Sequence, residues 1–128
     1  MSFDKFKYYR DKNLMDLARD QECLLQVDNF CRGEGDTSST VACHENSQSR
    51  GKGMGIKSSH AFTVWGCHEC HKWLDQGSAS KKEKEIVFQN AFERQLQEWQ
   101  KIADNVCLKP WKVQSARNVL QYLKEHHG

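Results

Sequence analysis

The sequence predicts an α+β domain in which a short β-hairpin and a helix surround a metal site and a helical half follows. Three observations predict this class. Cys67 and Cys70 are separated by two residues, the spacing that closes one side of a tetrahedral metal site. Two short segments, 39–44 and 61–65, are rich in β-branched and apolar residues. Beyond Gly77 the apolar residues recur with helical spacing in two stretches.

The composition indicates a single small domain with a lean core. The chain has 128 residues, of which 38% are hydrophobic and 28% charged, and its mean hydropathy is −0.84. Domains with so little apolar material often need a metal ion or disulfides to fold. The net charge of +2 and a pI of about 8.2 do not by themselves indicate a nucleic-acid binder.

The six cysteines are predicted to be thiolates on a metal rather than disulfides. The N-terminal segment 1–7 carries charges where a signal peptide needs an apolar run, and no later segment is apolar enough to span a bilayer. We therefore expect a cytoplasmic location, where the environment is reducing and disulfides are rare.

The elements can be assigned in order along the first half. Residues 1–22 predict a leading helix that ends near Asp20, and 22–27 predict a short strand. The segment 39–44 predicts a strand that finishes on His44. Residues 48–59 carry three glycines among basic residues and predict a loop, and 61–65 predict a second strand that runs into the Cys67–Cys70 pair.

The second half is predicted to be helical. Ser80 and Glu83 form a capping box, which starts a helix whose apolar positions run from Phe88 to Ala103. The segment 109–111 interrupts the pattern, and 113–123 form another amphipathic helix. We therefore expect a zinc-containing core with its leading helix in residues 1–77. A C-terminal helical extension in residues 78–128 would pack on or beside it.

Cys23 and Cys31 are the best candidates to complete a four-thiolate zinc site with Cys67 and Cys70, because turn residues between them let the chain fold back. Cys43 and Cys107 are the competitors. The run 67–71 also spells the c-type haem attachment pattern, but the absence of an export signal argues against it. A thioredoxin-like redox pair would need a βαβ context, which is missing.

A second set of residues has the chemistry of a reactive site. If a helix starts at Cys70, His71 and Asp75 lie one turn apart on one face, an imidazole–carboxylate pair suited to a divalent ion. His44, at the end of a strand, could be an ordinary surface histidine. A histidine on a strand, a loop, a second strand and a helix with further ligands is, however, the layout of the HNH or ββα-metal nucleases. Phosphodiester hydrolysis needs a base such as His44 and a divalent ion on the phosphate.

The chain also resembles a family of small lambdoid phage and prophage proteins, the YbcO-like HNH-type nucleases. The resemblance covers roughly residues 10–77 and is carried by an ordered set of motifs: Glu22-Cys23-Leu24, Cys31, Thr40-Val41-Ala42-Cys43-His44, the segment 51–57, and the segment 65–75. It implies a ββα-metal fold, a structural zinc held by four cysteines, and metal-dependent DNA endonuclease activity. It also implies His44 as general base and His71 as metal ligand.

The sequence departs from the HNH pattern at three positions. Cys43 stands where many of these enzymes have an acid or histidine that ligates the metal, so either Cys43 is a ligand or fewer protein groups hold the ion. No residue clearly matches the middle asparagine; His60 is nearest but poorly placed. Asp75 stands where a second helix histidine is common.

The resulting hypothesis is a DNA endonuclease of phage or prophage origin that acts in phage DNA recombination or processing with Mg²⁺ or Mn²⁺. Arg50, Lys52 and Lys57, in a segment without acidic residues, are predicted to contact the DNA backbone. The alternatives are a non-catalytic zinc module that binds DNA or protein, and a structural zinc protein whose C-terminal helices mediate assembly. We expect no membrane partner. Homo-oligomers or phage recombination proteins are expected as possible partners.

Overall fold

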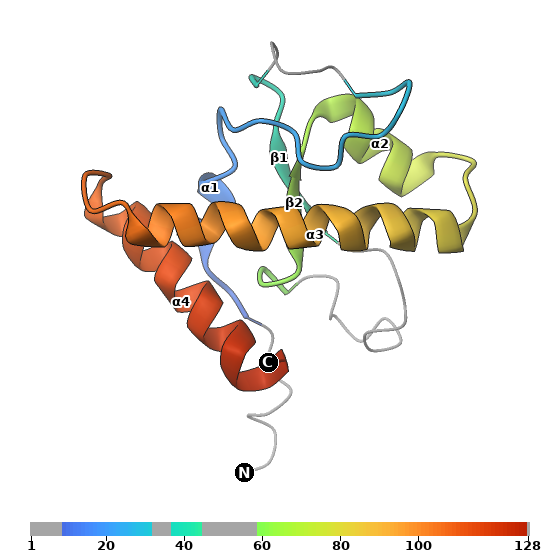
Figure 1. Cartoon of the computed structure of the whole chain (residues 1–128). Helices are drawn as coiled ribbons and strands as arrows, with labels where there is room; N and C mark the ends of the chain where they lie inside the picture. The colour runs from blue at the N-terminus through green and yellow to red at the C-terminus, as the bar shows by residue number, and fades with distance from the viewer. Residues whose placement is uncertain (1–8, 32–36, 45–58, 128) are drawn as a thin grey trace.

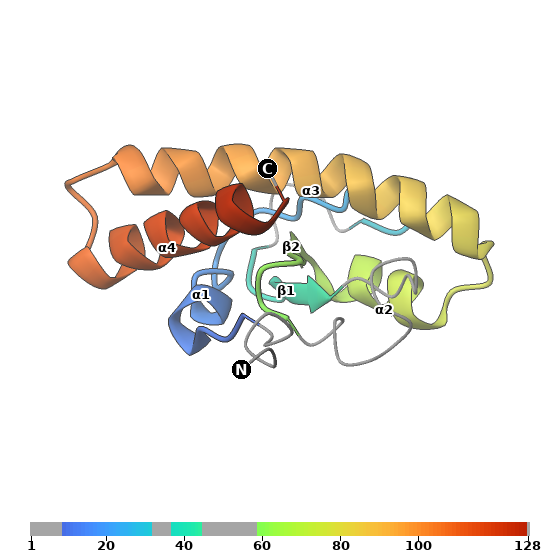
Figure 2. The ribbon, with the colours of Figure 1, turned by 90° about the horizontal axis from the view of Figure 1, so that it is seen from below.

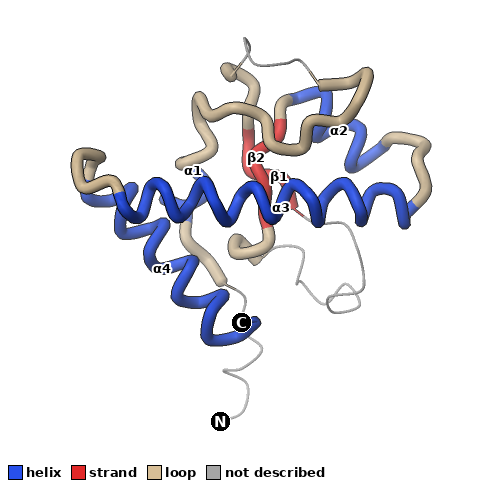
Figure 3. Tube along the Cα trace, viewed as in Figure 1, coloured by secondary structure: helices blue, strands red, loops and turns tan. Residues whose placement is uncertain are grey.

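The computed structural model describes residues 9–31, 37–44 and 59–127, and its elements follow one another as two strands and four helices within these ranges (Figure 1). Figure 3 shows that helix predominates and that the two strands lie together near the centre. The elements are α1 (Lys12–Asp16), β1 (Val41–His44), β2 (Thr63–Gly66), α2 (His68–Gln76), α3 (Lys81–Asp104) and α4 (Pro110–His127). The prediction of a mixed α+β fold is confirmed.

The two strands form an antiparallel hairpin that fixes which residues face the core. Its register pairs Val41 with Gly66 and His44 with Thr63. Because successive side chains on a strand point to opposite faces, Cys43 and His44 are directed away from each other. Cys43 is fully buried, whereas His44 is half-buried. The chain then passes through Cys67 directly into α2, so the end of β2 and the first turn of α2 form one continuous knuckle.

The long helix α3 lies across the hairpin and covers one of its sides (Figure 2). The predicted cap at its start is confirmed for Ser80, whose hydroxyl accepts a hydrogen bond from Glu83 N at 3.0 Å. Gln95 is buried against β2, and its Oε1 accepts a 2.9 Å hydrogen bond from Trp65 N. Arg94 donates two hydrogen bonds to the carbonyl oxygen of Leu24. These contacts fix α3 to both the hairpin and the cysteine-bearing loop.

The last helix, α4, packs against α3 and against α1 near the start of the described chain. Pro110 is its first residue, a position where the missing N–H and the fixed φ of proline are favourable. Arg117 Nε donates a 3.0 Å hydrogen bond to Ala103 O of α3. The ring of Tyr122 lies 4.7 Å, centroid to centroid, from Tyr9. The turn between the two helices is residues 105–109, so the interruption predicted at 109–111 overlaps its last residue and the first turn of α4.

Two predicted elements differ in the structure. The leading helix is only one short segment, Lys12–Asp16, within the described residues, and the chain turns at Asp20, whose φ is 64°. Residues 22–27 do not form a strand, although Leu24 N donates to Trp65 O at 2.7 Å. The reason is that Gln26, with φ 50°, turns the backbone around the sulfur of Cys23 and ends any extended run. Among the described helices, none is long and apolar enough to cross a membrane.

Candidate metal centre and histidine cluster

Four cysteines from two parts of the chain, the loop 23–31 and the segment 67–70, converge at one point. The Sγ atoms of Cys23, Cys31, Cys67 and Cys70 all lie within 4.8 Å of one another. Sulfur atoms bound tetrahedrally to one zinc at a Zn–S distance of about 2.3 Å would be about 3.8 Å apart, so the cluster is close to the size that zinc needs. A soft metal such as zinc prefers this all-thiolate donor set. The four residues could therefore hold a structural zinc ion.

The backbone around the cluster favours thiolates. Gln26 N donates to Cys23 Sγ and Val27 N donates to Cys70 Sγ, each at 3.4 Å. The pKa of Cys23 is lowered to about 5, first because of the hydrogen bond from the Cys70 thiol and also through the Gln26 amide. The same contact with Cys23 raises the pKa of Cys70. Two sulfurs thus share a proton at the place where a cation would bind both as thiolates.

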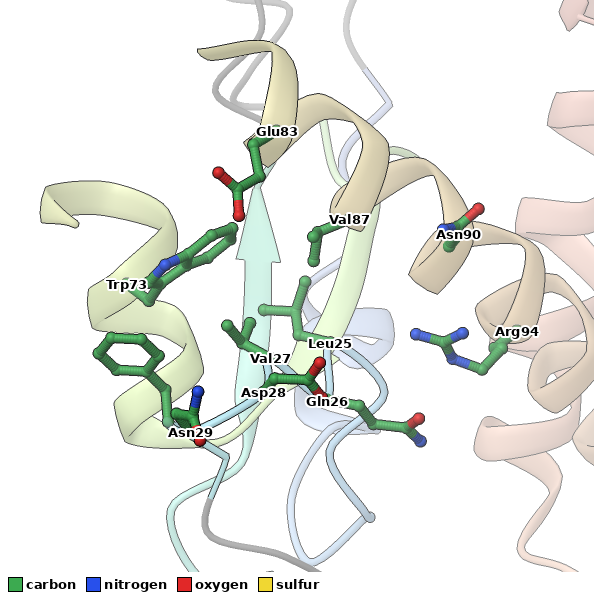
Figure 4. Close-up of a pocket in the computed structure, with 11 residues that line it drawn as sticks. Leu25, Gln26, Val27, Asp28, Asn29, Trp73, Glu83, Val87, Asn90 and Arg94 are labelled. Carbon is green, nitrogen blue, oxygen red and sulfur yellow. The ribbon is translucent and has the colours of Figure 1, made fainter. Parts of the chain in front are cut away.

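A glycine and a tight loop make this convergence possible. A Cβ on Gly66 would lie 2.6 Å from Leu25 Cδ1 and 2.8 Å from Cys43 Sγ, so no larger residue fits without displacing buried atoms. The loop 24–30 turns a second time at Asn29, whose φ is 70°. Figure 4 shows this loop between α2, which carries Trp73, and α3, which carries Val87. The metal candidate is therefore embedded between three elements rather than attached at an edge.

The two competing cysteines lie elsewhere. Cys43 is fully buried in the core beside Gly66 and is not a member of the cluster. Burial, above all, raises the pKa of its thiol, so it stays protonated. Cys107 is exposed in the turn between α3 and α4. The core-facing direction of Cys43 also separates it from His44, its neighbour in the strand.

The histidines gather at the other face of the hairpin. His44 stands at the end of β1, and its ring centroid lies 6.1 Å from that of His60. The register explains this proximity, since His44 pairs with Thr63, and Thr63 Oγ1 donates at 3.0 Å to the carbonyl of His60 in the turn before β2. His60 Nδ1 accepts a 2.7 Å hydrogen bond from Asp11 N, which places the proton of its neutral ring on Nε2.

The predicted pair on α2 is present, and it interacts internally. His71 Nε2 lies 3.1 Å from Asp75 Oδ2, one turn apart on the partly exposed face of the helix. The helix starts at His68 rather than at Cys70, which leaves this spacing unchanged. Within the described ranges, the four cysteines are the group of metal-ligand residues with closely spaced ligand atoms; His44, His71 and Asp75 do not form a second such group.

The charge state of His44 depends on its burial and on four nearby ionisable residues. Its pKa is lowered, first because burial disfavours the charged ring, and further by His60, His71 and Arg10. Asp75 acts in the opposite direction. The Nε2 atom of His44 is buried and has no hydrogen-bond partner among the described residues. A neutral imidazole with an unpartnered nitrogen can accept a proton.

Some predicted site residues lie outside the described part of the chain, and the sequence alone does not indicate two residues near His44. Arg50, Lys52 and Lys57, predicted to contact DNA, lie outside the described residues. The position of His60 was undervalued from the sequence; the signal that would have found it is the hairpin register, which brings the turn before β2 beside the end of β1. No local pattern indicates that Arg10, far upstream, contributes to the electrostatics of His44.

Comparison with known proteins gives a family. No curated protein and no solved structure matches this chain. A family model described as "Putative nuclease YbcO" matches residues 12–104, which run from the start of α1 to the end of α3. The matched residues include the four cysteines of the cluster, His44, His60, His71 and Asp75. Because this match covers well over half of the 128 residues and agrees with the resemblance drawn from the motifs, the chain belongs to the YbcO family of nucleases.

Proposed function

We propose that this chain is a metal-dependent DNA endonuclease of the HNH type, of phage or prophage origin, that acts in phage DNA recombination or processing. The family supports a nuclease-type function and a nucleic-acid substrate. The observation that carries the finer proposal is the unpartnered, buried Nε2 of His44 in a site that also contains His60, His71 and Asp75. The order β1, β2, α2 supports a ββα-metal core.

His44 is the proposed general base. Its lowered pKa keeps the imidazole neutral at pH 7, because burial and the neighbouring histidines disfavour the charged form. Among the described residues Nε2 has no hydrogen-bond partner to give up, so it can accept a hydrogen bond from a water molecule that enters the site. Removing a proton from this water produces the nucleophile that attacks phosphorus. His60 lies beside His44 in the site, and the hydrogen bond from Asp11 N fixes the orientation of its ring.

His71 and Asp75 are the residues that would hold the reactive divalent ion. Their chemistry fits Mg²⁺ or Mn²⁺, because a carboxylate oxygen and an imidazole nitrogen are side by side at 3.1 Å on one helix face. When bound, such an ion stabilises the charge that develops on the phosphate and the leaving oxygen. With Cys43 buried in the core, the described residues offer few ligands, so water and phosphate oxygens would complete the coordination.

The remaining assignments complete the proposal. Cys23, Cys31, Cys67 and Cys70 hold structural zinc, which positions the end of β2 against α2. Arg50, Lys52 and Lys57 contact the DNA backbone. Residues 1–77 form the nuclease core and 78–128 the helical extension, and the protein works in the host cytoplasm.

The test is cleavage of supercoiled plasmid with Mn²⁺ or Mg²⁺ added to the zinc-loaded protein. We expect nicking or linearisation by the wild type and a loss of at least about 100-fold in His44→Ala, the usual contribution of a general base. His68→Ala is the matched control, because His68 is an exposed imidazole at the start of the same knuckle. Full activity in His44→Ala would overturn the base assignment.

One observation favours a second candidate, a zinc module that binds DNA or protein without cutting. His71 and Asp75 bond to each other, and Cys43 faces the core, so the protein ligands for a reactive ion are few. Salt-dependent DNA binding without cleavage under any divalent ion would support this candidate and exclude the first.

A further inference from the structure

A groove of about 330 Å³ lies between the start of the described chain and α4. It is open to solvent, its lining is partly apolar, and the partly exposed indole of Trp111 forms part of its wall. The whole of α4, which forms one wall, lies beyond the region that the family match covers. The side chains that define the groove are Tyr9, Arg10, Asn13, Trp111, Gln114 and Asn118.

The groove adjoins the histidine cluster. His60 N donates to Tyr9 O at 2.7 Å, and Asp11 N donates to His60 Nδ1 at the same distance. Arg10, between these two residues, lowers the pKa of His44 and therefore lies within electrostatic reach of it. The segment 9–11 therefore belongs to both sites. Its backbone bonds to His60, which lies beside His44, and its residues also line the groove.

The wall formed by α4 carries groups that recognise nucleotides. Trp111 is 36% exposed, while the other three tryptophans are buried to 6% exposure or less. Lys112 Nζ lies over one face of the Trp111 ring, 5.7 Å from its centroid, which puts a positive charge on the indole and leaves stacking to the opposite face. Gln114 Nε2 donates to Asn118 Oδ1 at 2.8 Å, a bond that leaves the oxygen of one amide and the nitrogen of the other for base edges.

The dimensions fit a short stretch of strand. Trp111 and Asn118 are about 10 Å apart along α4, at about 1.5 Å per residue. Successive nucleotides of one DNA strand rise by about 3.4 Å, so this distance spans about three of them. The groove also contains one acidic residue, Asp11, whose carboxylate accepts a hydrogen bond from Asn13 N at 3.0 Å at the start of α1.

The other hollows have a different character. The hollow of about 370 Å³ in Figure 4, between the cysteine-bearing loop and α3, contains the carboxylates of Asp28 and Glu83 beside Arg94. Another contains Asp20, Glu22 and Glu98 and is strongly acidic. Phosphate would be repelled from both. The groove at α4, unlike these two hollows of the described residues, has a partly exposed indole and cationic side chains together.

We infer that this groove binds the unpaired nucleotides that flank the scissile phosphate, with a base stacked on Trp111 and a phosphate held by Arg10. The inference rests on the proposed nuclease function and specifies its substrate: a nucleic acid with a single-stranded segment next to the cut. Stacking on an exposed aromatic residue requires an unpaired base, because paired bases are already stacked within the duplex. Arg10 then joins the groove to the site of chemistry.

Intrinsic fluorescence tests this directly, because Trp111 is the exposed tryptophan. Zinc-loaded protein, without added Mg²⁺ or Mn²⁺, is titrated with a single strand of about 12 nucleotides, within the range of single-strand site sizes. We expect quenching in the wild type, none in Trp111→Leu, and a loss of affinity of roughly tenfold in that variant. Arg10→Gln should weaken binding and reduce the salt slope by about one.

Phe30→Leu is the matched control, since Phe30 is an exposed aromatic residue that lines the hollow of about 370 Å³ and not the groove at α4. This substitution should leave the affinity unchanged. If the wild type cuts DNA but Trp111→Leu binds the strand equally well and shows the same quenching, the proposed binding role of the groove would be excluded. The proposed nuclease function would then still stand. An equal loss of affinity for a blunt duplex of the same sequence would overturn the stacking role. A wild type that neither binds nor cuts DNA would instead overturn the proposed function itself.

Discussion

At the scale of single residues, His44 is distinguished by its surroundings rather than by its type. Burial and the neighbouring His60, His71 and Arg10 all disfavour the protonated ring, so its pKa lies below the ordinary value for histidine. A base is active only when deprotonated. The neutral fraction of His44 therefore rises with pH and reaches its plateau below the pH at which an isolated histidine would.

We accordingly expect the cleavage rate at saturating Mn²⁺ to rise with pH and to level off with an apparent pKa below about 6.5. Below this value the rate should fall about tenfold per pH unit, because each unit removes nine-tenths of the remaining neutral imidazole. Single-turnover rates across pH 4 to 9, a range of about five units, measure this. An apparent pKa clearly above that of free histidine would contradict the role of burial at His44.

Gly66 is a second residue whose identity is determined by its neighbours. Gly66→Ala would place a methyl group 2.6 Å from Leu25 Cδ1 and 2.8 Å from Cys43 Sγ. We expect unfolding of the zinc-loaded protein to become easier by about 1–3 kcal/mol, as for other overpacked cores, in a chemical denaturation experiment. Adding Leu25→Val should relieve part of the clash, so the double variant should be more stable than the two separate losses predict.

At the scale of elements, α3 is joined to the sheet by a buried polar contact. Gln95 Oε1 accepts the Trp65 N–H at 2.9 Å at a position without access to water. Gln95→Leu leaves that amide unpaired, and we expect a loss of about 1–3 kcal/mol in the free energy of unfolding. Gln97→Leu, at an exposed position of the same helix, should change it by less than about 0.5 kcal/mol. Equal effects would show that the buried bond does not stabilise the docking of α3.

The elements differ in how well the sequence predicts them. The start of α3 is predicted correctly because the signal is local: Ser80 caps Glu83 N within one turn. The end of β1 at His44 is likewise confirmed. Residues 22–27 were wrongly predicted as a strand, because the turn at Gln26 depends on a sulfur site formed with Cys70, far along the chain. The clustering of His60 with His44 also depends on tertiary register.

At the scale of the whole molecule, the four cysteines bring together two parts of the chain that are far apart in the sequence. Cys23 and Cys31 come from one loop, and Cys67 and Cys70 from the knuckle. The cluster was predicted from the sequence, because the C-x2-C spacing and turn residues are local signals. The hydrophobic material is limited, so a bound metal is expected to supply a large share of the folding free energy, on the order of 10 kcal/mol.

Metal removal should therefore unfold the protein. We expect a single zinc per chain by elemental analysis, and loss of the cooperative thermal transition after treatment with a strong chelator. Cys31→Ser should lose zinc and the transition, whereas Cys107→Ser, which changes an exposed thiol outside the cluster, should retain both. Retention of zinc and of full stability in Cys31→Ser would exclude the four-cysteine site.

We propose that His44 removes a proton from the attacking water, and chemical rescue tests this role of His44 most directly. His44→Gly leaves space where the imidazole was, so free imidazole can occupy it and act as the base. If His44 is the base, this variant, loaded with zinc and supplied with Mn²⁺, does not cut DNA without imidazole and regains cleavage as imidazole is added. Cleavage by His44→Gly at the wild-type rate without imidazole would contradict it.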